Sequence, residues 1–422
     1  MKIPYFRPDV SEDDIVEVVT TLRSGWLTTG PRVRAFEEQF AAAVNGKHAV
    51  AVNSCTAALH LAVESLGLAT GQAVLVPTMT FAATAEVVRY QGAVPILVDC
   101  DPVTLNMDLE DAALKLQQMR TDHLPANINA RLPVIGIIPV HVGGQMMDVG
   151  AVQRFASQHG LWIVEDAAHA FPAAWRNTEN DKWQRCGEAT ASVSCFSFYA
   201  NKTITTGEGG MAVTNNDSIA ERMKLMSLHG LSHDAWGRYS EQGSWDYKII
   251  APGFKYNLTD LAASIGIHQL ERAKNMRMKR EAIAHRYFEL LADVEQIEMP
   301  TVDSNRSNSW HLFIIRLRLD RVRTTRSEFI NQLGKRGVNC SVHWRPLHLH
   351  PYYRDTFGWR AEAFPTATRE WERLISLPIF PGMSKSEIEY VAATVKDVCA
   401  ASSLSRSVPS HDRPVVRTSA LV

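Results

Sequence analysis

The chain has 422 residues, and its 44 lysine and arginine residues nearly balance its 45 aspartate and glutamate residues. Its length predicts at least two subdomains, and its hydrophobic fraction of 45% is typical of a soluble globular protein. A net charge of −1 excludes a global basic field that would hold nucleic acid, so any anionic ligand needs a local site. No apolar run reaches the roughly 18 residues of a membrane span, so we expect no membrane association.

In chain order, Ser11 and Asp14 mark the start of a helix, and residues 24–31 form a turn-rich loop. From about residue 46 to 230, short apolar runs alternate with amphipathic stretches. The runs are 49–52, 74–76, 95–98, 134–140, 161–164 and 191–198, and the helix candidates include 56–66, 80–91 and 149–159. Unbroken apolar runs are typical of strands that helices cover on both faces. The pattern therefore predicts an α/β fold with a mostly parallel central sheet.

A smaller α/β unit is expected after a long helix that begins near Thr259. Residues 310–317 and 338–342 have the pattern of strands, and residues 327–335 have the pattern of a helix. We therefore predict a large domain with an N-terminal arm, a smaller domain with the linking helix, and a disordered tail rich in serine, arginine and proline. Their bounds are 1–250, 251–400 and 401–422.

The six cysteines, at positions 55, 100, 186, 195, 340 and 399, contain no Cys-x-x-Cys pair. This spacing predicts neither a zinc ribbon nor a disulfide framework and is typical of a reducing compartment. The segment Met1–Tyr5 lacks the apolar stretch of a signal peptide, so we expect a cytoplasmic protein. Three histidines lie between His343 and His350, but without nearby cysteines or paired carboxylates we predict no metal site there.

A short polar segment follows the first apolar run. Asn53 and Ser54 end that run, and Cys55 and Thr56 begin the next expected helix. Free N–H groups and the positive end of the dipole make a helix N-terminus an anion site, which suits a phosphate. A plain helix cap by Ser54 is the alternative.

Two acidic residues, Glu165 and Asp166, end the run 161–164, and His169 follows them. A carboxylate at the end of a buried strand is costly unless it is paired, and one possible partner is the proton of a cationic heterocycle. A helix cap or a salt bridge is the alternative reading.

Lys202 lies in a loop between the apolar run 191–198 and a glycine-rich turn that ends at Gly210. A lysine that is held at a strand end and partly removed from water can have a neutral amine and form a Schiff base. Ser197 at the end of the same run can donate to a phosphate, and the ring of Phe81 can stack on a flat ligand. The alternatives are a surface lysine, a satisfied strand hydroxyl and an aromatic side chain of the core.

Together these four elements match the needs of pyridoxal 5′-phosphate (PLP). This cofactor requires a lysine for its imine, a carboxylate for its pyridine nitrogen, a phosphate cup and a stacking surface. Ligands of parallel sheets bind at the carboxyl ends of the strands, and the four elements follow such strands. The sequence therefore predicts PLP as the cofactor.

The chain also resembles the PLP-dependent sugar-nucleotide aminotransferases of the DegT family, which have fold type I. The resemblance covers Pro4 to about Val398 and rests on six segments. They are SGWLTTGP (24–31), NSCTAAL (53–59), EDAAH (165–169), FSFYANKTITTGEGG (196–210), GFKYNLTD (253–260) and SLPIFPGM (376–383).

The resemblance implies a role for each candidate site residue. Lys202 carries PLP as a Schiff base, Asp166 contacts the pyridine nitrogen, His169 lies near the ring hydroxyl and Phe81 stacks on the ring. The implied phosphate contacts are Cys55, Thr56, Ser197 and, from the other subunit of a homodimer with shared active sites, Asn257.

The family reaction moves an amino group from L-glutamate, which leaves as 2-oxoglutarate, to a nucleotide-linked keto-sugar. It serves amino-sugar, cell-surface polysaccharide or glycoside biosynthesis. The segments 24–30 and 253–260 look most like those of members that act at a 4-keto group. The residues that we expect in the sugar-nucleotide groove are Trp26, Thr28, Thr29, His229 and His343.

Two other functions compete with this one. Some relatives are PLP-dependent sugar dehydratases, but these have a histidine in place of the lysine, and Lys202 argues against that reaction. A regulatory relative that kept the fold and lost catalysis is the other possibility, and the intact set of Lys202, Asp166, Phe81 and Ser197 argues against it.

Overall fold

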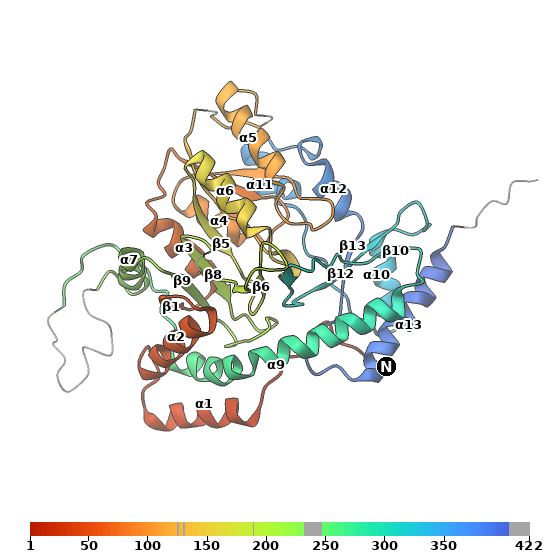
Figure 1. The fold of residues 1–422 in the computed structure, drawn as a ribbon, viewed down its shortest axis with the longest axis horizontal. Coiled ribbons are helices and arrows are strands. Elements are labelled where there is room, and N and C mark those ends of the chain that lie inside the picture. The colour runs from red at the N-terminus through yellow and green to blue at the C-terminus, as the bar shows by residue number, and fades with distance from the viewer. Residues whose placement is uncertain (125, 130, 189, 232–246, 405–422) are drawn as a thin grey trace, which may run out of the picture.

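The computed structural model of the chain describes residues 1–422 except 125, 130, 189, 232–246 and 405–422 (Figure 1). The α-helices are α1 (Glu12–Ser24), α2 (Pro31–Val44), α3 (Cys55–Ser65), α4 (Ala83–Tyr90), α5 (Leu109–Thr121), α6 (Val149–His159), α7 (Asp217–Ser227), α9 (Asp260–Leu291), α10 (Arg326–Lys335), α11 (Pro351–Phe357), α12 (Pro365–Trp371) and α13 (Lys385–Ser402). Short 3-10 helices are η1 (Val142–Gly144), η2 (Leu347–Leu349) and η3 (Ala361–Ala363).

The strands form three sheets. They are β1 (His48–Val52), β2 (Ala73–Pro77), β3 (Val94–Val98), β4 (Val134–Ile137), β5 (Trp162–Asp166), β6 (Ala174–Trp175), β7 (Gln184–Arg185), β8 (Val193–Ser197), β9 (Gly210–Thr214), β10 (Ile297–Glu298), β11 (Arg306–Ser307), β12 (Phe313–Leu317) and β13 (Leu374–Leu377).

The central sheet has seven strands in the order β1-β9-β8-β5-β4-β2-β3. Strand β9 is antiparallel to both of its neighbours, and the other strand pairs are parallel. The prediction of a mostly parallel sheet in an α/β fold is therefore confirmed.

Both faces of this sheet are covered, as the unbroken apolar runs predicted. On β1, Val50 and Val52 face one hydrophobic core, whereas Ala49 and Ala51 face another. Because neighbouring side chains of a strand point to opposite faces, each strand contributes to two cores at once. The ribbon shows α3, α4 and α6 beside the sheet and α2 beside β1 (Figure 1).

Helix α9 connects the large unit to the smaller one. It begins after Thr259, whose side chain caps the helix, and it contacts α1, α2 and α13 along its length. The smaller unit is built on the antiparallel sheet β10-β12-β13, which packs with α9, α10 and α13 around one core. Ile3 at the N-terminus lies in this same core, so the N-terminal arm reaches the C-terminal unit.

Two expectations about the C-terminal part differ from the structure. Residues 338–342 do not form a strand, because Val338 and Ser341 make single bridges to different partners, Ile3 and Ser376, instead of a continuous ladder. Helix α13 continues to Ser402, beyond the predicted start of the tail at 401, and residues 405–422 of that tail lie outside the described residues.

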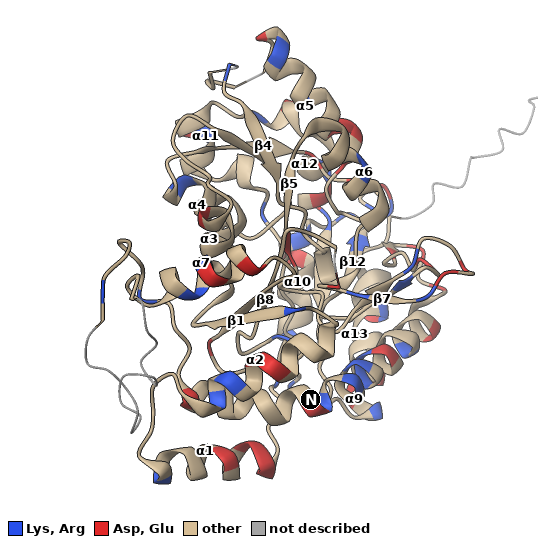
Figure 2. Ribbon diagram, turned by 60° about the vertical axis from the view of Figure 1, so that its left-hand side comes forward, with Lys and Arg blue, Asp and Glu red and all other residues tan. Residues whose placement is uncertain are grey.

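Charged residues of both signs are interspersed on the outer helices, including α1, α2 and α9 (Figure 2). Among the described residues, none of the helices is both long enough and apolar enough to cross a membrane.

Candidate active site

A cavity of about 550 Å³ lies at the carboxyl ends of β5 and β8, next to the N-terminus of α3. Its wall brings together most of the candidate residues, which come from segments far apart in the chain. The candidates that line it are Cys55, Thr56, Phe81, Asp166, His169, Ser197, Lys202 and His343.

The N-terminus of α3 forms one end of this cavity. Ser54 caps the helix by accepting the N–H of Ala57 at 3.1 Å, and the first N–H groups of a helix have no partner within it. Strand β9 packs closely against this helix N-terminus at Gly210. Only glycine fits there, since a Cβ would lie 2.6 Å from the backbone nitrogen of Cys55. Burial raises the pKa of the Cys55 thiol well above its usual value, so the thiol stays neutral and does not repel an anion.

Lys202 enters the cavity from the loop between β8 and β9. The loop is fixed by a backbone hydrogen bond from Phe198 to Gly209 (2.9 Å) and by the Thr205 hydroxyl, which donates to the Phe198 carbonyl at 3.0 Å. Burial lowers the pKa of Lys202 to about 8, although Cys55 and Asp166 oppose this shift. A substantial fraction of the amine is therefore neutral near physiological pH and can attack a carbonyl.

Asp166 ends β5 and is buried at the cavity wall. The Thr84 hydroxyl of α4 donates to Oδ2 at 2.7 Å, and the N–H of Ala168 donates to Oδ1 at 3.2 Å. Burial raises the pKa of Asp166, while the hydrogen bond from Thr84 acts in the opposite direction. A buried carboxylate with few donors suits a cationic partner in the cavity, such as a protonated pyridine.

Three aromatic rings, those of His311, His343 and Trp344, lie around His169. Its ring stacks on Trp344 with centroids 4.9 Å apart and lies 4.2 Å from the ring of His311. Burial lowers the pKa of His169 well below its usual value, so the imidazole is neutral. Its Nδ1 is buried and has no hydrogen-bond partner among the described residues.

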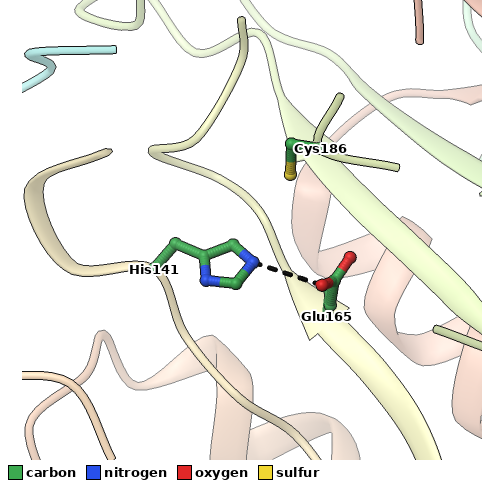
Figure 3. Close-up of side chains that lie close together, drawn as sticks. All are labelled: His141, Glu165 and Cys186. Atoms are coloured by element: carbon green, nitrogen blue, oxygen red, sulfur yellow. Dashed lines mark ion pairs between the residues drawn. The ribbon is translucent and has the colours of Figure 1, made fainter. Parts of the chain in front are cut away.

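A second buried cluster lies behind Asp166 and consists of His141, Glu165 and Cys186 (Figure 3). The N–H of Met147 donates to Nδ1 of His141, so Nε2 carries the hydrogen and faces Oε1 of Glu165 at 3.4 Å. The other carboxylate oxygen of Glu165 accepts hydrogen bonds from the hydroxyls of Thr190 (2.5 Å) and Ser194 (2.6 Å).

These contacts keep Glu165 ionised in the core. Burial acts to raise the pKa of Glu165, but His141 and the two hydroxyls together bring it below its usual value. Since Glu165 precedes Asp166 on β5, the cluster holds the strand end that positions the cavity carboxylate.

Other candidates lie outside this cavity within the same chain. Asn257 donates to the Thr29 hydroxyl at 2.7 Å, and both residues line a different hollow of about 690 Å³ between α2, β1 and α7. Trp26 donates to the Thr29 carbonyl at 3.2 Å, and the Thr28 carbonyl accepts the N–H of Asp260 at 3.2 Å. His229 follows α7 and donates its backbone N–H to Phe254. The structure thus does not bring these candidates to the cavity of their own chain.

The three histidines between 343 and 350 have separate neighbours. His343 pairs with the Ser376 hydroxyl at 2.8 Å, and His350 lies 3.2 Å from the Arg345 carbonyl. His348 lies between the hydroxyls of Thr78 and Thr368.

Four residues in or next to the cavity wall were not among the predicted site residues: Thr84, His141, His311 and Trp344. Thr84 follows Thr80 by four residues in the expected helix 80–91, and such spacing places both hydroxyls on one helix face. His141 follows the apolar run 134–140, where a strand end was expected. No local pattern pointed to His311 or Trp344, because only the fold carries these distant segments to the cavity.

The model of the DegT/DnrJ/EryC1/StrS aminotransferase family matches residues 8–396. The chain belongs to this family. Protein MJ1066 of Methanocaldococcus jannaschii is 42% identical over 396 residues, which cover 94% of this chain and 97% of that protein. The spore coat polysaccharide biosynthesis protein SpsC of Bacillus subtilis is 40% identical over 397 residues, which cover 94% and 97%.

A solved protein named as a sugar aminotransferase has a similar fold. Spr1654 of Streptococcus pneumoniae, in its pyridoxamine phosphate (PMP) form, superposes with a TM-score of 0.84 at 30% identity. The match covers 95% of this chain and 100% of Spr1654. The same protein has also been solved in its PLP form. This DegT-family chain is therefore a PLP-dependent aminotransferase, and the predictions of family, fold and cofactor are confirmed.

The cavity fits PLP on its own chemistry. It offers an amine with a lowered pKa at Lys202, a buried carboxylate at Asp166 and a helix N-terminus at Cys55 and Thr56 for the phosphate. Phe81, with 62% of its surface exposed, lies at the cavity wall with no core to fill, so its ring is free to contact a ligand.

Proposed function

We propose that this enzyme transfers the amino group of L-glutamate to the 4-keto carbon of a nucleotide-linked keto-sugar. The observation that carries the proposal is that a lysine with a lowered pKa, Lys202, and a buried carboxylate, Asp166, line the same cavity of a fold shared with a sugar aminotransferase. The likeness to SpsC supports a place in polysaccharide biosynthesis.

When bound, PLP supplies an electron sink for the carbon that loses a proton. Lys202 Nζ takes the proton from the amino-bearing carbon of glutamate and later delivers a proton to the sugar carbon. A pKa of about 8 lets this amine act as base and as acid in turn near neutral pH. Asp166 accepts the pyridine N–H and keeps that nitrogen protonated.

The other cavity residues bind and orient. The N–H groups of Cys55 and Thr56 and the hydroxyl of Ser197 hold the phosphate at the α3 N-terminus, where the helix dipole favours an anion. Phe81 stacks on one face of the ring. His169 would contact the ring hydroxyl, and its imidazole remains neutral because burial lowers its pKa.

We also propose a homodimer in which each subunit completes the site of the other. Asn257 and Thr29 are hydrogen-bonded to each other and do not line the cavity of their own chain. Residues that complete the site of a second subunit must lie outside their own site in this way. Helix α1 exposes Ile15, Val16 and Leu22 at 47%, 59% and 51%, and a second copy would cover this apolar face.

In that dimer Asn257 reaches the phosphate of the other subunit. Trp26, Thr28, Thr29 and His229 then border the sugar-nucleotide groove together with His343, which already lines the cavity. In this arrangement Asn257, Trp26, Thr28, Thr29 and His229 serve the site of the partner subunit, so they need not lie near Lys202 of their own chain.

Two measurements test the proposed reaction. L-glutamate alone should convert the purified PLP form to the PMP form, with loss of the visible absorbance and release of 2-oxoglutarate. A panel of nucleotide-linked keto-sugars with glutamate, followed by mass spectrometry and NMR, should then yield a 4-amino sugar.

Lys202→Ala is the control, and it should show neither the Schiff-base absorbance nor any product. An enzyme that binds PLP but is not converted by glutamate would contradict the proposed amino donor. A product aminated at another carbon would contradict the 4-keto assignment. A deoxygenated sugar without nitrogen would support the dehydratase instead.

A further inference from the structure

His311 lies in the cavity wall with no polar partner. Its side chain is buried, with 4% of its surface exposed, and neither ring nitrogen has a hydrogen-bond partner among the described residues. A neutral imidazole has one N–H donor and one acceptor, and leaving a buried polar group without a hydrogen bond is unfavourable. A side chain of this kind at a cavity wall is suited to a ligand that satisfies it.

A buried positive charge lies directly behind His311. The Arg280 guanidinium donates to the carbonyl oxygens of Trp310 (3.3 Å), His311 (3.4 Å) and Ile379 (2.8 Å). Within the described ranges no carboxylate pairs with it, and although burial lowers the pKa of Arg280 to about 10, it remains charged at neutral pH. The wall at His311 is therefore a place of uncompensated positive potential.

Neither of the two carboxylates that line the cavity, Asp166 and Glu208, forms an ion pair with Arg280, and Glu208 is exposed to solvent, which screens its charge. Asp166 is held by Thr84 and Ala168, and the proposed function assigns it to the pyridine nitrogen. His343 beside the same wall is neutral, because burial lowers its pKa to about 4. The phosphate of PLP belongs at the opposite feature, the α3 N-terminus. The wall therefore favours an anion other than the cofactor phosphate.

We propose that His311 donates a hydrogen bond to the α-carboxylate of the amino donor. The positive charge of Arg280 attracts this carboxylate to the wall. The inference rests on the proposed function, since glutamate is the donor there. The α-carboxylate is bonded to the carbon from which Lys202 takes the proton, so it must lie close to Lys202. Lys202 and His311 line the same cavity, and the lysine charge acts on the imidazole.

This subsite would distinguish the donor from the acceptor. A nucleotide-linked keto-sugar has hydroxyl groups next to its reacting carbon, and its negative charge lies on the distant diphosphate. Only the amino acid places a carboxylate beside the reacting carbon. His311 should therefore matter for the half-reaction with glutamate and much less for the half-reaction with the sugar.

The first experiment compares His311→Leu with His311→Asn, which keeps an N–H donor. Each PLP-loaded protein is mixed with L-glutamate, and the loss of visible absorbance gives a limiting rate and an apparent Kd. The limiting rate divided by the apparent Kd should fall about tenfold or more in His311→Leu. In His311→Asn this ratio should stay close to that of wild type. Unchanged PLP content in both variants shows that the cofactor site is intact.

The second experiment changes the amino donor instead of the protein. L-isoglutamine has an amide in place of the α-carboxylate, and L-glutamine has an amide in place of the γ-carboxylate. Wild type should discriminate strongly against isoglutamine, and His311→Leu should reduce that discrimination while leaving the penalty for glutamine unchanged. If the penalty for isoglutamine stayed the same in the variant, the assignment of His311 would be overturned.

A binding measurement gives the same comparison without turnover. Calorimetry of glutarate with the PLP-loaded protein should show a Kd about tenfold higher for His311→Leu and near wild type for His311→Asn. Equal Kd values in all three proteins would also overturn the assignment. A wild type that binds PLP and glutarate but is not converted by glutamate would refute the proposed function and leave an anion subsite without that donor.

Discussion

Thr84 of α4 donates a hydrogen bond of 2.7 Å to Oδ2 of Asp166 at the end of β5. The Thr84 hydroxyl is itself 2.7 Å from that of Thr80, so a short chain of hydroxyls leads from the helix to the carboxylate. Both threonines are buried, and water cannot replace either of them easily. A helix packed against the sheet thus fixes the carboxylate that we assign to the pyridine nitrogen.

Replacing Thr84 by Val removes this donor and keeps the shape of the side chain. Burial already raises the pKa of Asp166, and without Thr84 it should rise further, so the carboxylate becomes a weaker partner for a cation. We expect kcat/KM to fall about tenfold and the Kd of PLP to rise. Thr84→Ser keeps the hydroxyl and should stay close to wild type in both measurements; a Ser variant as impaired as the Val variant would point to packing instead.

Asp166→Asn keeps the size of the side chain and an acceptor for Thr84 but removes the negative charge. The protein should still bind PLP through Lys202, while turnover falls by at least about 100-fold, because the protonated pyridine loses its stabilising charge. Steady-state kinetics and the absorbance of the bound cofactor measure the two effects separately. Near-normal turnover in this variant would refute the role of Asp166.

The rate at which the PLP-free protein captures PLP should depend on pH through Lys202. Only the neutral amine attacks the aldehyde, and burial lowers the pKa of Lys202 to about 8. The capture rate, followed by stopped-flow absorbance, should rise about tenfold per pH unit below that value and level off above it.

Asp166→Asn is the matched variant for this pH dependence. The negative charge of Asp166 raises the pKa of Lys202, so its removal should move the plateau to lower pH. A capture rate that still rose above pH 10, as for an ordinary lysine, would show that Lys202 is not desolvated.

Mixing two inactive variants tests the shared active sites of the proposed homodimer. Lys202→Ala lacks the amine, and Asn257→Asp brings a negative charge toward the phosphate of the other subunit. After subunit exchange, half of the dimers are mixed and each has one intact site, so about a quarter of the wild-type activity should return. Activity that stays absent after verified exchange would show that Asn257 serves its own subunit.

His141→Phe tests the buried cluster behind the active site. Without the N–H of His141, the buried Glu165 carboxylate keeps only the hydroxyls of Thr190 and Ser194 as donors, which should lower the free energy of unfolding by about 1–3 kcal/mol. Cys186→Ala removes a neighbour of the same cluster without leaving a charge, and it should cost only about 1 kcal/mol. Urea denaturation at equal protein concentration measures both.

The effect of His141→Phe should depend on pH. The pKa of Glu165 is lowered in the folded protein, so the stability that its partners provide is present above its unfolded pKa and is lost as the pH falls below it. The difference in the free energy of unfolding between wild type and His141→Phe should therefore shrink below about pH 4.5. A difference that is constant with pH would mean that the variant acts through packing alone.

Local patterns in the sequence were sufficient to predict the α/β organisation and to select the main candidate residues of the site. Apolar runs without alternation indicated strands covered on both faces, and the residues just after those runs included Asp166 and Lys202. These signals are local because backbone geometry places the residue after a parallel strand at the ligand-binding edge of the sheet.

Other features depend on contacts between distant segments. Residues 338–342 have the alternation of a strand, yet they meet Ile3 and Ser376 at single positions and form no ladder. Asn257 and Thr29 belong to motifs of the family, but where they lie relative to the cavity is decided by the path of α9 and the N-terminal arm.

By itself, the sequence determined the α/β fold, through its alternating apolar and amphipathic segments, and the cofactor. It also placed at strand ends the lysine and the carboxylate that we assign to that cofactor. Only the tertiary structure decided the surroundings of those groups. Thr84 supports Asp166, and Arg280 lies behind His311, through packing of elements that are separate in the chain. The physical reason is that burial and charge pairing set the pKa of Lys202 and of Asp166, and both are properties of the whole folded chain.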